Sequence, residues 1–82
     1  MEAVIVVDWR EYIEINPEIL VGKPILRGTR LAVELVLDLL AAGVAFDELA
    51  EDYPGLTRDQ VLACMAYAAE VIRGERVLPL VV

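Results

Sequence analysis

Residues 22–30, with the sequence Gly-Lys-Pro-Ile-Leu-Arg-Gly-Thr-Arg, constrain the fold of this 82-residue chain most strongly, because no helix or strand period runs through them. Pro24 fixes its own φ and keeps Lys23 out of the helical region, while Gly22 and Gly28 permit turns with positive φ. We therefore expect a tight, stiff connection here, with short extended pieces before it and helices after it.

The N-terminal third is predicted to hold short strands. Residues 3–7 are a β-branched run, residues 12–15 alternate in part, and residues 24–26 are a third extended piece. Asn16-Pro17 marks a turn. Strands this short are not stable by themselves in water, so they must pack on the helices or on another subunit.

The first helix is expected over residues 31–42, with Gly43 at its C-terminal cap and Thr29 as a capping residue near its start. Its residues are almost wholly apolar, so the helix should be buried on most sides.

A short second helix is predicted to end at Pro54-Gly55 and to have two contrasting faces. The apolar face has helical spacing and consists of Phe46, Leu49, Ala50 and Tyr53. The other face is acidic and consists of Asp47, Glu48, Glu51 and Asp52. These four carboxylates are the candidate contact for a partner protein.

A third helix is expected to begin at the capping box of Thr57 and Gln60 and to run to about residue 72. Periodicity predicts an inner side of Val61, Leu62, Met65, Ala68, Ala69 and Ile72. It predicts an outer side of Gln60, Ala63, Tyr67 and Glu70. Residues 77–82 are an apolar tail that we expect to dock on a neighbour.

The charge is strongly negative overall and reversed in the loop at residues 22–30. The chain has 14 acidic and 7 basic residues, and three of the cations, Lys23, Arg27 and Arg30, lie in this loop. The loop is therefore a candidate contact for nucleic acid, together with Arg58 and Gln60 at the start of the third helix. The alternative is that the loop cations only pair with the chain's own carboxylates.

Composition argues against an enzyme. The chain has no histidine, and its single cysteine, Cys64, lacks a base to activate it. We therefore expect no catalytic residue, no cofactor, no metal and no small-molecule substrate.

A hydrophobic content of 59% exceeds what a small globule buries, so we expect a homodimer. No run is long and apolar enough for a membrane span, and we expect a cytoplasmic protein.

Four motifs occur in order and give the chain a family resemblance. They are residues 22–30, Leu-Leu-Ala-Ala-Gly at 39–43, Asp-Tyr-Pro-Gly-Leu-Thr at 52–57, and Val-Leu-Ala at 61–63 followed by Tyr-Ala at 67–68. Residues 12–72 closely resemble domain-of-unknown-function family 433, whose members look like antitoxins of the VapB type. The resemblance implies short strands before a homeodomain-like trihelical unit, often dimeric, and in some operons a PIN-like ribonuclease toxin as partner.

The predicted fold is thus mainly α, with short N-terminal β-strands and a helix-turn-helix unit in a single domain over residues 1–82. Residues 1–30 hold the strands and the basic loop, residues 31–73 the three helices, and residues 74–82 the tail. The predicted function is an antitoxin-like adaptor that binds a ribonuclease toxin and also touches operator DNA. The alternative is a stand-alone helix-turn-helix DNA-binding transcriptional regulator, which the negative charge opposes.

Overall fold

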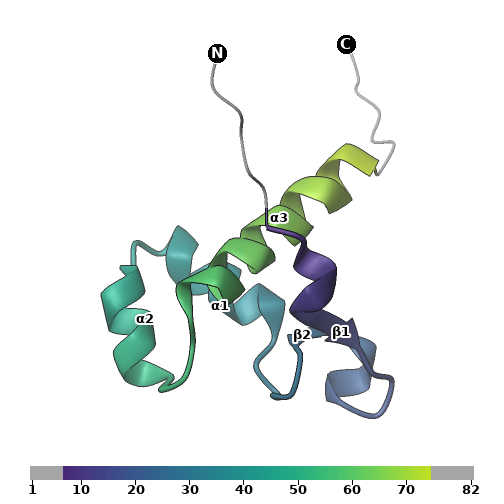
Figure 1. Ribbon diagram of the computed structural model, residues 1–82, viewed down its shortest axis with the longest axis horizontal. Helices are drawn as coiled ribbons and strands as arrows, with labels where there is room; N and C mark the ends of the chain where they lie inside the picture. The colour runs from purple at the N-terminus through teal and green to yellow at the C-terminus, as the bar shows by residue number, and fades with distance from the viewer. Residues whose placement is uncertain (1–6, 75–82) are drawn as a thin grey trace.

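The computed structural model describes residues 7–74 (Figure 1). The strand predicted at residues 3–7, except Val7, and the apolar tail at 77–82 lie outside the described residues. The elements in order are η1 (Trp9–Glu11), β1 (Ile13–Ile15), η2 (Leu20–Gly22), β2 (Pro24–Leu26), α1 (Val33–Ala41), α2 (Phe46–Asp52) and α3 (Arg58–Gly74). The predicted mainly α fold with three helices and short N-terminal strands is confirmed. Helix α3 crosses the middle of the molecule and packs against α1 and η1, while α2 lies to one side (Figure 1).

The two strands pair in antiparallel orientation, with Ile13 opposite Leu26 and Ile15 opposite Pro24. The turn that follows β1 is built by Asn16. Its carbonyl oxygen accepts a hydrogen bond from the amide of Ile19 at 2.9 Å, and its side-chain oxygen accepts one from the amide of Glu18 at 2.9 Å. Both strands and this turn lie where the sequence predicts them.

The connection from β2 to α1 is a tight turn held by Thr29. The Thr29 hydroxyl donates to the carbonyl oxygen of Leu26 at 2.7 Å and accepts from the amide of Leu31 at 2.9 Å. Gly28 has φ +81°, as the turn requires. Thr29 therefore does not cap α1, contrary to prediction: the helix begins at Val33, after an extended Ala32 that provides no side-chain cap.

Helix α1 is less buried than its composition predicts. Only Val33 and Val36 are fully buried, and Leu35 is 37% exposed. Helix α1 packs against α3 and β2. Leu37, Leu39 and Leu40 are only partly buried against the core, and Leu35 faces away from it.

Two of the predicted helix ends are confirmed. Gly43, at φ +93°, closes α1, and the amide of Val44 donates to the carbonyl oxygen of Leu39 at 3.0 Å in a Schellman arrangement. At the start of α3 the Thr57 hydroxyl accepts from the amide of Gln60 at 3.1 Å. The Gln60 side-chain oxygen accepts in turn from the amide of Thr57 at 2.8 Å.

Helix α3 presents a different face to the core from the one predicted. Val61, Ala63 and Cys64 are buried, although Ala63 was expected outside. Three large residues expected inside are exposed: Leu62 by 37%, Met65 by 46% and Ile72 by 69%. Periodicity identifies the most apolar arc of a helix, whereas α1 and η1 pack against the arc that carries the smaller Ala63 and Cys64.

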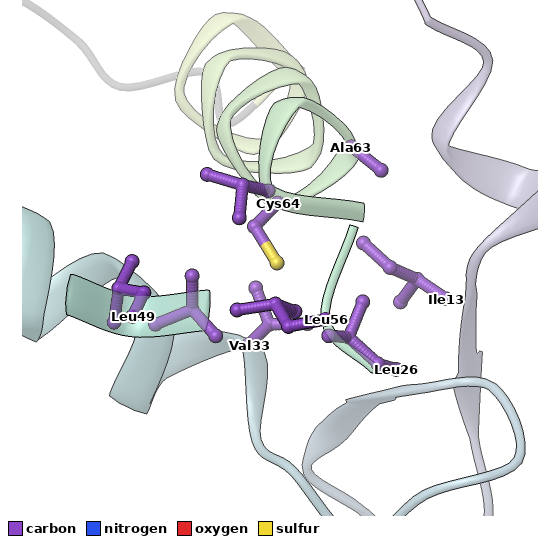
Figure 2. Close-up of a cluster of buried hydrophobic side chains, with 9 residues drawn as sticks. Ile13, Leu26, Val33, Leu49, Leu56, Ala63 and Cys64 are labelled. Atoms are coloured by element: carbon purple, nitrogen blue, oxygen red, sulfur yellow. The ribbon is translucent and has the colours of Figure 1, made fainter. Parts of the chain in front are cut away.

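The core joins the sheet to all three helices (Figure 2). Its fully buried members are Ile13, Leu26, Val33, Val36, Leu49, Leu56, Val61, Ala63 and Cys64. The sulfur of Cys64 points into this cluster (Figure 2). Burial raises the pKa of the Cys64 thiol to about 11, so the group stays protonated at neutral pH and is a core residue and not a nucleophile.

Candidate functional site

Two of the sequence motifs meet at one open cleft of about 520 Å³. It lies between the turn after β2 and the connection from α2 to α3. Its lining residues are Leu26, Thr29, Arg30, Leu31, Asp52, Tyr53, Pro54, Gly55, Leu56 and Gln60. The cleft therefore brings one loop cation, Arg30, near the C-terminal end of the acidic helix α2.

Two of the three loop cations are engaged within the chain. The Lys23 ammonium lies 3.3 Å from the Glu34 carboxylate on α1. Arg27 donates to the carboxylate of Glu14 at 3.1 Å and to the carbonyl oxygens of Arg10 and Ile13 at 3.0 and 3.2 Å. Arg27 thus ties the turn after β2 to the strand beside it, which favours the structural alternative for this residue.

The remaining candidate nucleic-acid contacts do not form one basic surface. Arg30 and Arg58 are exposed and make no ion pair with another residue of the described range 7–74. The Gln60 oxygen is used in the capping box with Thr57. Lys23 lines a separate hollow beside Glu34 and Asp38, not the cleft that holds Arg30.

The candidate partner contacts, in contrast, share one exposed surface on α2. Leu49 anchors the inner face of this helix in the core, and Phe46, Ala50 and Tyr53 are partly buried, as predicted. The four outward carboxylates are all exposed: Asp47, Glu48, Glu51 and Asp52. Within residues 7–74 no cation forms an ion pair with any of them. We call these four residues the acidic α2 face.

A polar and aromatic cluster between η1 and α3 was not predicted. The Trp9 indole N–H donates to one oxygen of Glu70 at 3.0 Å, and Arg10 donates to the other at 2.8 Å. The Arg10 guanidinium lies 4.4 Å from the centre of the Trp9 ring, which meets the Tyr67 ring edge to face at 4.8 Å. Trp9 is a packing anchor, and Tyr67 and Glu70, predicted on the outer side of α3, contact η1 through it.

Glu70 makes this cluster sensitive to acid. Hydrogen bonds from Trp9 and then Arg10 lower the pKa of the Glu70 carboxyl below its ordinary value of 4.5. The unfolded chain therefore binds a proton at Glu70 more readily than the folded chain does. The stability that ionised Glu70 contributes is complete above about pH 4.5 and is lost as pH falls through the folded-state pKa.

Urea unfolding followed by Trp9 fluorescence tests this role. We expect the urea midpoint of Glu70→Gln to change less between pH 6 and pH 3 than that of the wild type. Glu11→Gln, at an exposed position on η1, is the matched control. Equal pH slopes for Glu70→Gln and the wild type would contradict this role.

Neither a metal site nor a membrane span is found among the described residues. No three His, Cys, Asp or Glu side chains within residues 7–74 come together as metal ligands would. None of the helices in this range is long and apolar enough to cross a membrane.

Comparisons with known proteins agree on one group. The sequence model of the family described as "Protein of unknown function (DUF433)" matches residues 13–68. The uncharacterized protein y4eO of Sinorhizobium fredii is 37% identical over 68 residues, which are 82% of this chain and 31% of that protein. The chain thus spans less than a third of the length of this relative. The crystal structure of a DUF433 member protein from Anabaena variabilis matches with a TM-score of 0.70 and 30% identity, over 74% of this chain and 60% of that one.

Proposed function

As the chain belongs to the DUF433 family of proteins of unknown function, we propose from the charge on its surface that it is an antitoxin-like adaptor. In this role the acidic α2 face binds a basic surface of a partner ribonuclease of PIN-like type.

The observation that supports this proposal is the uneven neutralisation of charge within the chain. Glu14, Glu34 and Glu70 each have a cation as neighbour, at 3.1, 3.3 and 2.8 Å. The acidic α2 face forms no ion pair within residues 7–74. Like charges held on two turns of one helix repel each other, and a cationic partner removes that cost.

The form of α2 suits a fixed contact. Gly43 lies just before the helix and Pro54 just after it, and Leu49 is fully buried beneath it. Glu48 also accepts a hydrogen bond from the amide of Ala45 at 3.1 Å, which holds the start of the helix. A ribonuclease carries cations where it binds the phosphates of RNA. A group of carboxylates on one helix face complements such a surface and competes with RNA for it.

The geometry supports a stand-alone DNA-binding regulator less well. Helices α2 and α3 have the order and the short connection of a helix-turn-helix unit. However, the outer face of α3 presents Leu62, Met65 and Ile72, which offer no hydrogen bonds to base edges. Arg30 and Arg58 remain for phosphate contacts, beside an α2 that repels phosphate.

The test is binding to a PIN-like ribonuclease, taken from a gene beside this one where such a gene is present, measured by isothermal titration at several salt concentrations. We expect Asp47→Asn, Glu48→Gln, Glu51→Gln and Asp52→Asn together to weaken binding at least about tenfold and to reduce its dependence on salt. Glutamine at position 48 retains an oxygen for the bond to Ala45, so α2 keeps its start.

The control carries the same change of charge at four exposed positions elsewhere: Glu11→Gln, Glu18→Gln, Glu34→Gln and Asp38→Asn. It should bind nearly as the wild type does. Equal losses in both variants would mean that net charge alone matters and would refute a contact at the acidic α2 face. Absence of binding by the wild type would refute the adaptor itself.

A further inference from the structure

The exposed arc of α3 is an apolar surface that the described fold leaves uncovered. It consists of the exposed Leu62, Met65 and Ile72 and the partly buried Ala69, which recur on one side of the helix over about 15 Å. Met65 is 46% exposed and Ile72 is 69% exposed. We call these four residues the α3 arc. Three large apolar side chains in line on one helix are typical of a helix–helix contact.

Charge indicates what covers this arc. Helix α1 carries two acidic residues and α2 carries four, and neither helix has a basic residue. Helix α3 carries two basic residues, Arg58 and Arg73, and two acidic residues, Asp59 and Glu70. A second copy of this acidic chain is repelled by the surfaces of α1 and α2. The charges on α3 sum to zero, so a second copy is not repelled there.

We propose that the α3 arc binds the same arc of a second copy of this chain, with the two α3 helices antiparallel about a two-fold axis. This order places Leu62 against the partner's Ile72 and the large Met65 against the partner's small Ala69. It also brings Asp59, which lies one turn before the arc, close to the partner's Arg73. The two-fold axis forms this contact twice in each dimer.

This interface is separate from the acidic α2 face and leaves it free for a ribonuclease. It also covers the side of α3 that a helix-turn-helix reader inserts into the major groove. A dimer formed in this way therefore does not read DNA through α3.

The first test is the oligomeric state by light scattering across micromolar concentrations. We expect twice the chain mass of 9.1 kDa for the wild type and the single mass for Met65→Glu. Leu35→Glu, at a comparably exposed leucine on α1, should stay dimeric. Circular dichroism melts confirm that each variant folds. A monomeric wild type, or a folded Met65→Glu variant that remains dimeric, overturns the proposal.

Charge reversal tests the orientation. Asp59→Arg alone and Arg73→Asp alone should each raise the dimer dissociation constant about tenfold, because both contacts in the dimer become repulsive. The double variant should recover the wild-type constant to within a few-fold. Failure of the double variant to recover, while it melts like its parents, contradicts the antiparallel order.

Cross-linking gives an independent result. A mixture of Leu62→Cys and Ile72→Cys chains should form a disulfide between the two kinds of chain under mild oxidation, while Leu62→Cys alone should not link to itself. The native Cys64 does not interfere, because it is fully buried and burial raises its pKa to about 11. Efficient self-linking of Leu62→Cys would show a parallel pair and overturn the proposed geometry.

All of these variants leave the acidic α2 face intact. A result that overturns the dimer therefore does not bear on ribonuclease binding, and each proposal can be refuted without the other.

Discussion

Leu26→Ala is expected to lower the free energy of unfolding by about 2–5 kcal/mol, because it leaves a cavity where the sheet meets the helices. Leu26 is fully buried, and its backbone is fixed by pairing with Ile13 and by the hydrogen bond from its amide to Leu31 at 3.0 Å. The surroundings therefore have little freedom to collapse into the space. In a domain of this size the loss is a large part of a total stability of roughly 5–15 kcal/mol.

Urea denaturation followed by circular dichroism measures this effect. The matched control is Leu35→Ala on α1, which removes the same atoms from a side chain that is 37% exposed. It should change the free energy of unfolding by less than about 1 kcal/mol. If both variants lose the same amount, Leu26 is not at the centre of the core.

Trp9→Ala should cost about 3 kcal/mol and loosen the N-terminal segment from α3. The substitution removes the edge-to-face contact with Tyr67, the hydrogen bond to Glu70 and the surface on which Arg10 lies. Since Trp9 is the single tryptophan, stability has to be followed by circular dichroism and not by fluorescence.

Trp9→Phe separates the ring from its N–H group. It keeps most of the aromatic contact and loses only the bond to Glu70, so we expect a loss of about 1 kcal/mol. Hydrogen exchange should then show faster exchange of the η1 and β1 amides in Trp9→Ala than in Trp9→Phe. Wild-type exchange rates for these amides in Trp9→Ala would contradict the role of Trp9 as an anchor.

Local features of the fold could be predicted from the sequence because their causes are local. Asn16, Gly43 and the Thr57 and Gln60 pair act on neighbours within a few residues, and each acts in the structure where the sequence places it. The two faces of α2 were predictable for a similar reason: its apolar and acidic residues separate at the helical period without a competing choice.

The errors arise where a distant part of the chain decides the outcome. The apolar period of α3 is real, but α1 and η1 pack on the arc with Ala63 and Cys64 instead. The bonds of Arg27 to Ile13 and Arg10 likewise cannot be read from the loop alone. The acidic α2 face is exposed as predicted, while of the five nucleic-acid candidates only Arg30 and Gln60 line one cleft.

The bond between Trp9 and Glu70 joins positions 61 apart in the chain, which has a consequence for how the protein is made. During synthesis η1 leaves the ribosome before α3, and Glu70 is translated only when nearly all of the described chain exists. The hairpin of β1 and β2 and the bond from Arg27 to the Arg10 carbonyl oxygen close over short separations, whereas the Trp9 side chain has to wait for α3. The Trp9 side chain is thus among the last groups to dock, and a nascent chain stalled before residue 70 exposes it to chaperones and proteases.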